Sequence, residues 1–472
     1  MSHFTPRPYQ RLIENYALEH ERCNIFASMG MGKTSASIAT FDTLRMFGEA
    51  KRALILAPKR VAMNSWPDEV VKWKESFGHL KIAAACGTPA QRLAAIRSTP
   101  DILTTNYENI EWLIEQYGDA WPFDIVFADE STKLKGLRIS IHKSKTGKEF
   151  VAGQGASRAK AIAKIAHTKV RRWVNLTGSP APNGIVDCWG QQWFVDRGQR
   201  LGNSFSAFSN RWFRAVPGGD GYSQIEPMPH AQAEVERLLA QTSITVDAKD
   251  WFDIKAPIER HVMIDLPPSA RKQYDEMQKE LFTWVANNPL EAFNAGTKSL
   301  KCLQLASGSV ILDKEGNWAP VHDEKIEALK SIKEETNGDN LLVAYQFRAD
   351  RERILKAFPK ARALDDNPRT LKDFQAGKIP MLVVHPASAG HGLDMQQSCR
   401  TLVDYSSGYN LEFDEQVIER VGPTRQLQSG FNRAVFRYRI VARNTLEQTS
   451  VLPRLKHKMS VQDSLKAAMK IS

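Results

Sequence analysis

The segment Ser28–Ser35, with the sequence SMGMGKTS, constrains the fold of this chain more than any other. It follows an apolar run that ends at Ala27 and precedes a helix-like stretch from Ala36 to Leu44. A strand that leads through a glycine-rich loop into a helix gathers backbone N–H groups and a helix N-terminus around one anion. In such a loop Lys33 would reach the β- and γ-phosphates of a nucleotide, and the Thr34 hydroxyl would bind Mg²⁺. The strict pattern has glycine where this chain has Ala27, and a turn that only caps a helix is the alternative.

A second apolar run, from Asp124 to Ala128, ends in the carboxylates Asp129 and Glu130. This pattern is typical of a buried parallel strand that delivers acidic side chains to the carboxyl edge of a sheet. Asp129 would hold Mg²⁺ through water, and Glu130 would orient or deprotonate the attacking water. Because two carboxylates would repel a triphosphate unless a metal ion lay between them, we expect ATP and Mg²⁺ as cofactors.

Three further apolar runs end in proline or in small polar residues, and a helix-like stretch follows each. They cover residues 53–58, 101–107 and 174–180. Alternating strand and helix patterns imply an α/β fold with a parallel sheet, whose functional groups cluster at one edge.

The basic residues are concentrated in one segment. The chain has 472 residues and a formal net charge of +11. Residues 133–172 contain twelve Lys or Arg residues and one acidic residue, Glu149, so basic and acidic residues balance in the rest of the chain. Such a segment is expected to contact a polyanion, here a nucleic acid, and a solvated insertion without a partner is the alternative.

Several classes of protein are disfavoured by the composition. No run of 18 apolar residues could span a membrane, and no apolar signal-peptide core follows Met1. The five cysteines are far apart, odd in number and never in a C-x-x-C pattern, so we expect a reducing compartment without disulfides or a zinc site. The length predicts two or three domains.

Six motifs in the first half resemble, in order, those of the superfamily 2 helicase/translocase family, and in particular its Swi/Snf-like branch. They are RPYQ at 7–10 (the adenine-reading entrance), MGMGKT at 29–34 (motif I), LAPK at 56–59 (motif Ia), TTNY at 104–107 (motif Ib), DESTKLK at 129–135 (motif II) and LTGSP at 176–180 (motif III). The family tolerates a residue such as Ala27. It usually has histidine where motif II has Thr132 here.

The second half continues the resemblance. A helical pattern at 322–335 precedes apolar runs at 341–347 (resembling motif IV), 381–385 and 401–405, with 386–394 resembling motif V and 416–426 resembling motif VI. The family commonly places two arginines three residues apart in motif VI, whereas Arg420 and Arg425 are five apart with Gly422-Pro423 between them. We expect both to act, with Arg425 as the arginine finger; an interlobe salt bridge for one of them is the alternative.

The resemblance implies an α/β fold of two RecA-like parallel-sheet lobes in tandem with helical insertions. We expect the first lobe at 1–215, a linker with helical protrusions at 216–320, the second lobe at 321–445 and a C-terminal helical brace at 446–472. Residues 200–260 are rich in aromatic, glycine and proline residues and read as an irregular excursion or linker. A helix from about Ser269 carries an apolar stripe that we expect to pack in a core, formed by Tyr274, Met277, Leu281 and Trp284.

The resemblance also assigns site residues. The catalytic set is Lys33, Asp129, Glu130, Arg420 and Arg425, with Thr34 and Asp129 at the metal. The nucleotide-binding set is Arg7, Gln10, Met29, Gly30, Gly32, Lys33, Thr34, Ser35, Gly392 and Asp394. The expected nucleic-acid contacts are Lys59, Thr105, Asn106, Lys133, Lys135, Arg138, Lys143, Lys145, Ser388 and Gly390. Thr177 and Ser179 would couple the ATP site to the nucleic-acid contacts.

The function implied is an ATP-dependent motor that hydrolyses ATP between two lobes and moves along DNA, which we expect to be duplex. An RNA or single-strand helicase of the same superfamily and an ATP-switched clamp without translocation are the alternatives; a different phosphate-loop enzyme fits the second half poorly. The compact length resembles stand-alone phage or bacterial members, so we expect a monomer without membrane contact in the cytoplasm of a bacterial or phage-infected cell.

Overall fold

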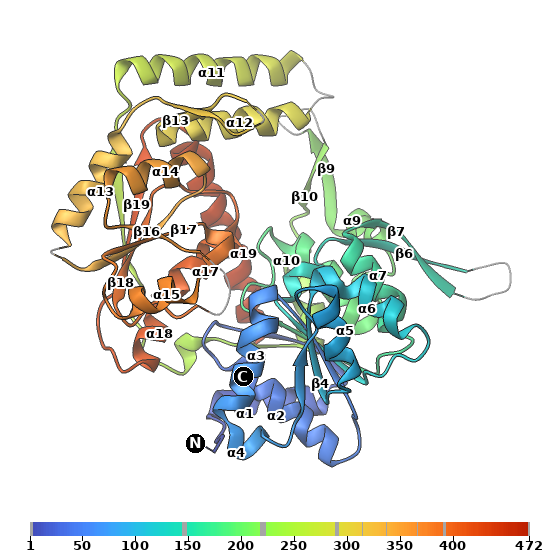
Figure 1. The fold of residues 1–472 in the computed structure, drawn as a ribbon. Helices are drawn as coiled ribbons and strands as arrows, with labels where there is room; N and C mark the ends of the chain where they lie inside the picture. The colour runs from blue at the N-terminus through green and yellow to red at the C-terminus, as the bar shows by residue number, and fades with distance from the viewer. Residues whose placement is uncertain are drawn as a thin grey trace. The chain divides into compact units, whose positions relative to one another are not determined.

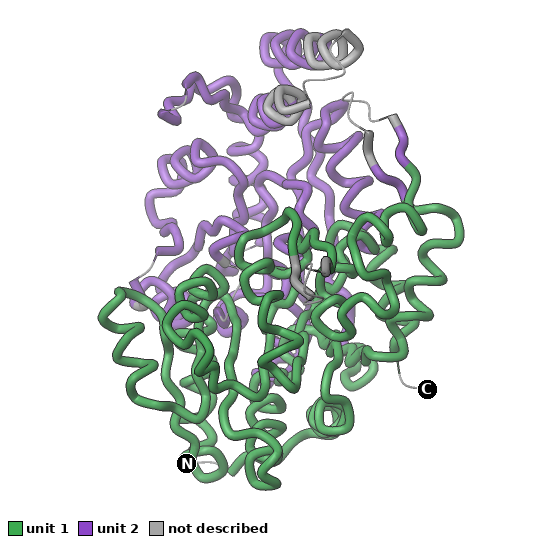
Figure 2. The backbone as a smooth tube through the Cα atoms, turned by 90° about the vertical axis from the view of Figure 1, so that its right-hand side faces the viewer, with its two compact units in different colours: residues 1–214, 227–253, 460–472 green, residues 215–226, 254–459 purple. Residues whose placement is uncertain are grey.

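A computed structural model describes residues 3–143, 149–217, 223–287, 292–313, 315–336, 338–365, 367–389 and 393–470. The chain forms two compact units (Figure 2). The first comprises Met1–Arg214, Pro227–Asp253 and Ser460–Ser472, and the second comprises Ala215–Glu226 and Ile254–Met459. Each unit is built on its own parallel sheet, which confirms the predicted α/β fold with two RecA-like lobes.

The sheet of the first unit has seven strands, and every neighbouring pair is parallel. Its order is β11 (Ser243–Val246), β1 (Arg22–Ala27), β8 (Arg172–Thr177), β5 (Ile125–Asp129), β2 (Ala53–Ala57), β4 (Ile102–Asn106) and β3 (Ile82–Ala84). The central strands are buried along their length because helices cover both faces, which is why they read as continuous apolar runs. The strands expected from the sequence are therefore confirmed.

Helices connect these strands, and their apolar faces form the core of the unit. They are α1 (Pro8–Glu19), α2 (Lys33–Met46), α3 (Trp66–Lys72), α4 (Lys74–Phe77), α5 (Pro89–Arg97), α6 (Ile110–Tyr117), α7 (Ser157–Ala166), α8 (Cys188–Asp196), α9 (Phe205–Trp212) and α10 (Ala231–Leu239). Large aromatic side chains such as Trp173, Trp189 and Trp193 are fully buried in this core. Trp173 stacks on Phe194 with ring centroids 4.7 Å apart.

The basic segment folds into a structure that the sequence analysis missed. Strands β6 (Leu137–Lys143) and β7 (Glu149–Gly155) form an antiparallel hairpin that projects from the first unit (Figure 1). The two strands approach closely at Gly153, whose φ is 144° and where a Cβ would lie 2.5 Å from the Arg138 carbonyl oxygen. Glycine is required there because any side chain would collide with the partner strand.

The prediction that residues 200–260 are irregular is wrong. They contain α9, a strand pair of β9 (Phe213–Pro217) and β10 (Ser223–Pro227), then α10 and the edge strand β11. Pro217 and Pro227 are the last residues of β9 and β10, and Gly218 and Gly219 lie outside the described residues. The elements are too short for a clear periodicity, so the sequence pattern alone does not reveal them.

The sheet of the second unit has six strands, again all parallel. Its order is β12 (Ile258–Ile264), β19 (Phe436–Ala442), β18 (Cys399–Asp404), β15 (Asn340–Ala344), β17 (Met381–Val384) and β16 (Arg362–Ala363). A small antiparallel pair, β13 (Ser309–Ile311) and β14 (Trp318–Pro320), lies outside this sheet. The strands expected at 341–347, 381–385 and 401–405 are confirmed.

The helices of the second unit include the expected helix at 322–335. They are α11 (Pro268–Asn287), α12 (Ala292–Ser307), α13 (Glu324–Glu335), α14 (Arg348–Ala357), α15 (Pro368–Gln375), α16 (Pro386–Ala389), α17 (Leu411–Glu419) and α18 (Pro423–Gln428). Helices α11 and α12 lie side by side (Figure 1). Tyr274 is fully buried in the core of this unit with Met277 against it, as expected, and the side chains of Leu281 and Trp284 lie outside the described residues.

The last helix, α19 (Leu452–Ala468), contributes to the core of each unit. Its first turns place Leu455 in a small cluster of the second unit, and its last turn places Leu465 in the main core of the first. Among the described helices, none combines the length and apolar character that crossing a membrane requires.

Candidate nucleotide-binding site

The glycine-rich loop joins β1 to α2 through two left-handed residues. Gly30 has a φ of 81° and Gly32 has a φ of 65°, and Gly32 is the N-cap of α2. A Cβ at Gly32 would lie 2.1 Å from Gln10 Nε2, so the close approach of α1 also requires glycine here. The loop geometry therefore leaves the backbone N–H groups at the start of α2 able to cradle an anion.

Lys33 turns back onto this loop. Its Nζ donates to the carbonyl oxygens of Ala27 at 2.7 Å and Ser28 at 3.4 Å. The hydroxyl of Thr34 makes no hydrogen bond to a described residue, whereas Ser35 Oγ donates to the Gly32 carbonyl at 3.2 Å. The donor set fits Mg·ATP, because an ammonium group, an unengaged hydroxyl and a glycine cradle lie within one turn.

Gln10 lies against the loop with its amide nearly buried. Its Oε1 accepts from the backbone N–H of Arg7 at 2.9 Å, and its Nε2 donates to Ser35 Oγ at 3.0 Å. An amide offers two acceptor and two donor positions, so one of each remains for a ligand. Arg7 Nη1 donates to the hydroxyl of Tyr9 at 3.3 Å.

Asp129 ends β5 and is held by two aromatic residues. Trp66 Nε1 donates to its Oδ2 at 3.0 Å, and the Tyr107 hydroxyl donates to its backbone carbonyl at 2.9 Å. Burial raises the pKa of Asp129, and the positive charge of Lys33 and the Trp66 hydrogen bond oppose that rise. Lys33 is therefore close enough to Asp129 for its charge to act on this carboxylate. Tyr107 lies in the predicted motif Ib. The sequence alone did not predict that Trp66 and Tyr107 donate hydrogen bonds to Asp129.

Glu130 adopts a left-handed backbone conformation, with φ 57° and ψ 57°. For a residue with a Cβ this costs about 1–2 kcal/mol, so the surrounding structure must hold it. Lys133 N donates to the Glu130 carbonyl at 2.9 Å, and the neighbouring Ser131 Oγ donates to Gln191 Oε1 at 2.7 Å. The strain lies at the residue that the sequence analysis assigned to water activation.

The end of β8 lies beside the same loop. A Cβ at Gly178 would lie 3.4 Å from the Ala27 carbonyl oxygen, and the buried Thr177 accepts from Ser179 N at 3.1 Å. Gln191, which accepts from Ser131, also donates to the Pro180 carbonyl at 2.8 Å. Motifs II and III are thus joined through one glutamine on α8.

The expected nucleic-acid contacts of motifs Ia and Ib differ in exposure. Lys59 is exposed at the end of β2. Thr105 is fully buried with its hydroxyl donating to the Ala85 carbonyl at 2.8 Å, and Asn106 is nearly buried and donates to Glu108 Oε2 at 2.8 Å. These hydrogen bonds favour structural roles for the Thr105 and Asn106 side chains, and their contact with nucleic acid stays a prediction.

The nucleic-acid contacts expected within and after motif II also differ in their burial and in their partners. Lys133 is half-buried, and Lys135 Nζ lies 3.7 Å from a carboxylate oxygen of the buried Asp187. The Arg138 guanidinium donates to the Lys135 carbonyl at 2.8 Å and lies 3.7 Å from the Phe205 ring centroid. The side chains of Lys143 and Lys145 lie outside the described residues.

The last three cations of the basic segment form ion pairs with acids of the first unit. Lys169 Nζ pairs with Asp119 at 2.8 Å, and Arg171 pairs with Glu21 at 2.8 Å. Arg172, the first residue of β8, pairs with Glu49 at 2.7 Å. Since parallel strands begin at the edge opposite their carboxyl ends, these last cations lie away from the phosphate loop.

In the second unit the motif V and motif VI residues meet. The buried Arg420 donates from Nε to the Gln416 carbonyl at 3.1 Å and from Nη1 to the Leu393 carbonyl at 3.5 Å. Arg425 forms an ion pair with Asp394, and burial lowers the pKa of Arg425 to about 10. Ser388 is exposed and donates to the His385 carbonyl at 2.8 Å. Gly390 and Gly392 lie outside the described residues.

Comparison with known proteins gives three kinds of match. Residues 12–298 match the family model described as the SNF2-related domain. A "putative protein p41" of Acyrthosiphon pisum secondary endosymbiont phage 1 is 46% identical over 473 residues, covering 100% of both chains. An "uncharacterized ATP-dependent helicase" of Mycoplasma genitalium is 22% identical over 446 residues, covering 89% of this chain but only 38% of that protein.

A solved structure, described as the Sulfolobus solfataricus SWI2/SNF2 ATPase core in complex with dsDNA, has a TM-score of 0.44 at 19% identity. The match covers 99% of this chain and 94% of that chain. The family match spans more than half of the chain and includes the phosphate loop and both carboxylates. The chain therefore belongs to the SNF2-related family and has a Swi/Snf-like ATPase core.

Proposed function

We propose that this chain is a nucleic-acid-stimulated ATPase that moves along duplex DNA. The observation that carries the proposal is the meeting of Lys33, Asp129 and the Thr177–Ser179 turn at the carboxyl ends of the adjacent strands β1, β5 and β8. A lysine, a metal-binding carboxylate and a following glutamate are what phosphoryl transfer to water requires. The dsDNA in the solved Sulfolobus complex agrees with a duplex substrate.

Nucleotide binding would exchange internal hydrogen bonds for contacts with phosphates. Lys33 would leave the carbonyls of Ala27 and Ser28 and bind the β- and γ-phosphates. The Thr34 hydroxyl would ligate Mg²⁺ directly and Asp129 through water, and the bound metal would neutralise phosphate charge. Gln10 would read adenine with its remaining amide donor and acceptor, with Arg7 beside it.

Hydrolysis would depend on residues of both units. Glu130, in its strained conformation, would orient the attacking water and accept its proton. Arg425 would stabilise the charge that develops on the transferred phosphoryl group, with Arg420 supporting it. Thr177 and Ser179 would transmit the nucleotide state to the DNA contacts, of which the exposed Lys59 and Ser388 are one in each unit.

The proposal is tested by steady-state ATP hydrolysis with duplex DNA, single-stranded DNA, RNA or no polymer. We expect duplex DNA to stimulate hydrolysis most, and Glu130→Gln to abolish turnover while ATP binding persists. Preferential stimulation by RNA or single-stranded DNA would identify a helicase of the same superfamily instead.

Displacement of a triplex-forming strand from duplex DNA then tests movement. A translocase removes the third strand only in the presence of hydrolysable ATP. ATP hydrolysis without displacement would indicate an ATP-switched clamp.

A further inference from the structure

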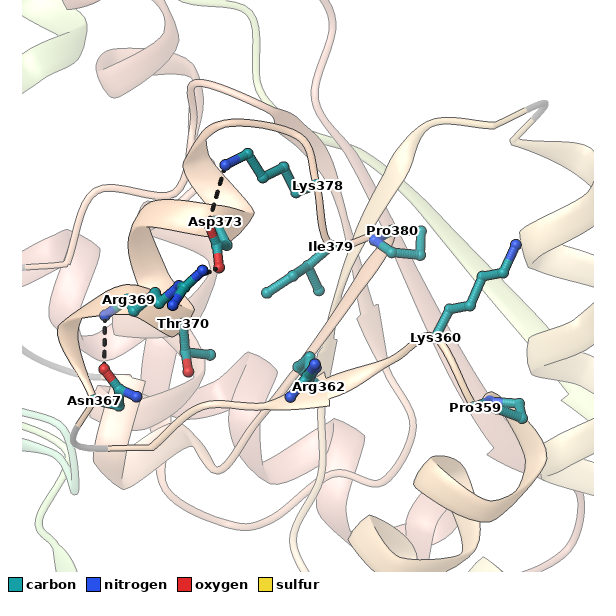
Figure 3. A pocket seen from close by; sticks show the side chains of 10 residues that line it. All are labelled: Pro359, Lys360, Arg362, Asn367, Arg369, Thr370, Asp373, Lys378, Ile379 and Pro380. Carbon is teal, nitrogen blue, oxygen red and sulfur yellow. Dashed lines mark hydrogen bonds and ion pairs between the residues drawn. The ribbon is translucent and has the colours of Figure 1, made fainter.

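A pocket of about 510 Å³ lies at the β16 edge of the second sheet, and nothing in the proposed motor cycle uses it. Its lining residues come from three segments: the turn before β16 together with β16 itself, helix α15 with its N-cap, and the turn that leads into β17 (Figure 3). The volume is in the range of small-ligand sites. Among the described strands β16 pairs with β17 alone, so it is an edge strand of this sheet.

Four basic side chains and one carboxylate line this pocket, which gives it a net charge of +3 among the described residues. They are Lys360, Arg362, Arg369, Lys378 and Asp373. Arg369 Nε lies 3.6 Å and Lys378 Nζ lies 3.4 Å from the two carboxylate oxygens of Asp373, so the acid holds these two cations together (Figure 3).

The opposite wall carries cations without such a partner. Neither the Lys360 nor the Arg362 side chain makes a hydrogen bond or ion pair with another described residue. On the α15 wall, the Thr370 hydroxyl likewise has no hydrogen-bond partner in the described part of the chain. The Asn367 side chain accepts from Arg369 N at 3.0 Å through Oδ1, which leaves its amide nitrogen available as a donor.

We propose that this pocket, called here the β16 pocket, binds the phosphate groups of an oligophosphate chain. Guanidinium and ammonium groups on two walls, with the neutral donors Asn367 and Thr370 beside Arg369 on the α15 wall, match several phosphate oxygens at once (Figure 3). Among the described residues the lining contains no aromatic side chain on which a base could stack, so recognition would be of phosphates and independent of base sequence.

Protection of the sheet edge is the other reason for charge at this place. A lysine or arginine on an edge strand discourages pairing with another chain. That role requires charge on the strand itself, as at Arg362. It does not explain why Lys360, Arg369 and Lys378 converge from three segments on one cavity.

The test uses the full chain in a Lys33→Ala background, so that the phosphate loop does not bind the probe. Tripolyphosphate is titrated calorimetrically into this protein, into the same protein with Lys360→Ala and Arg362→Ala, and into a control with Arg351→Ala and Lys356→Ala. The control removes one arginine and one lysine that are exposed on or beside α14 and do not line the pocket. Loss of even one charged hydrogen bond weakens binding by about tenfold or more.

We expect the pocket variant to bind tripolyphosphate at least about tenfold more weakly than the control variant. Equal binding by the two variants would overturn the proposal, because the effect would then be one of overall charge. The same pairs of substitutions are next compared with Lys33 intact for the salt dependence of duplex DNA binding.

The DNA measurement identifies the source of the phosphates. If the backbone of DNA occupies the pocket, the slope of log affinity against log salt falls, in the pocket variant only, by about 0.9 for each phosphate that is no longer neutralised. An unchanged slope, together with weakened tripolyphosphate binding, assigns the pocket to a free oligophosphate. Because ATP hydrolysis without DNA is measured on the same variants, failure of this proposal is separable from failure of the proposed function.

Discussion

Arg425 and Asp394 form an ion pair in the second unit, and Arg420 donates to the carbonyl of the adjacent Leu393. The two arginines therefore reach the same short segment although they are five residues apart. The reason is a break in the helix: α17 ends at Glu419, and α18 begins at Pro423 after the extended residue Gly422. Phasing along a single helix does not apply to residues on two helices.

The first prediction concerns the finger. Arg425→Ala should lower DNA-stimulated turnover by about 10³-fold or more, because an arginine finger contributes that much to phosphoryl transfer. The Arg425 side chain is one of the few in this segment that retains partial exposure, at 16%. Turnover near the wild-type value would move the finger role to Arg420.

The Arg420→Ala variant is compared with Arg425→Ala to separate a structural role from a catalytic one. It is buried, and it donates to two backbone carbonyls of its own unit, so Arg420→Ala should lower the thermal unfolding midpoint as well as activity. Arg425→Ala should leave the midpoint close to the wild-type value. Equal destabilisation by both variants would make both arginines structural.

The second prediction concerns Trp66, whose indole N–H donates to Asp129 Oδ2. Trp66→Phe keeps most of the buried ring and removes only that donor. If Asp129 holds Mg²⁺ as proposed, loss of this donor would orient the carboxylate less well. The Mg²⁺ concentration for half-maximal hydrolysis should then rise several-fold, which corresponds to about 1 kcal/mol for a missing hydrogen bond. Titration of activity with Mg²⁺ measures this.

Trp73 is the matched control, because its Nε1 donates to Glu69 Oε1 at 2.6 Å outside the candidate site. Trp73→Phe should leave the Mg²⁺ requirement unchanged. A similar shift in both variants would show that the effect of Trp66→Phe is a general loss of stability.

The third prediction concerns pH. Burial lowers the pKa of His322 to about 4, while its Nε2 lies 3.0 Å from the Leu305 carbonyl and its Nδ1 accepts from Glu324 N. The folded state therefore keeps this histidine neutral, whereas the unfolded chain takes up a proton below about pH 6.5. The contribution of His322 to the free energy of unfolding should be fully present above that pH and should be lost as the pH falls toward 4.

Between pH 7 and pH 5 the loss from this one group should be roughly 2 kcal/mol. Urea unfolding at the two pH values, for the wild type and for His322→Gln, measures it. The glutamine can still donate to Leu305 but does not titrate, so its stability should depend less on pH. An equal pH dependence in both proteins would contradict the assignment.

The fourth prediction concerns a buried ion pair in the second unit. Lys325 Nζ bonds to Glu447 Oε1 at 2.6 Å and to the Tyr405 and Ile440 carbonyls at 2.9 and 3.1 Å, with the lysine fully buried. Lys325→Met should reduce the free energy of unfolding by about 3–5 kcal/mol, because it leaves the Glu447 carboxylate buried without its partner.

Lys330 on the same helix gives the control. It pairs with Glu327 at 2.8 Å, but both side chains are about half exposed. Lys330→Met should change the free energy of unfolding by about 0–1 kcal/mol. Chemical denaturation of the two variants would contradict the argument if the losses were alike.

The sequence predicted the elements whose character is set locally. Central parallel strands such as β5 are apolar along their length because both faces are covered, and their polar ends mark the carboxyl edge. The edge strand β11 is short and half polar, and β6–β7 is basic and glycine-containing, so their existence depends on partners elsewhere in the chain. Such pairing leaves no periodic signal.

The candidate site divides in the same way. Lys33 and Asp129 could be predicted as site residues because the glycine-rich loop and the end of an apolar strand are local sequence patterns. The indole of Trp66 on Asp129 and the bridge from Ser131 through Gln191 to Pro180 join residues far apart in sequence. Only the folded backbone brings these residues together, so their contacts cannot be predicted from their spacing in the sequence.

The last prediction follows from the division of the basic segment. Lys143 is the last residue of β6, and Lys145 lies two positions later in the sequence, outside the described residues. Lys169 and Arg171, in contrast, form ion pairs with Asp119 and Glu21 near the start of β8. Changing Lys143 and Lys145 to Gln should reduce the slope of log DNA affinity against log salt by about 0.9 for each phosphate that is no longer neutralised.

Changing Lys169 and Arg171 to Gln removes the same charge and should leave the slope unchanged, because those cations are already paired with acids of the protein. Fluorescence anisotropy of labelled duplex DNA across a salt series measures both slopes. If the slope of log affinity against log salt falls equally in the two variants, the whole basic segment acts on DNA through its net charge. If it falls in neither variant, Lys143 and Lys145 lie outside the DNA interface, and DNA binding would have to depend on other residues such as Lys59 and Ser388.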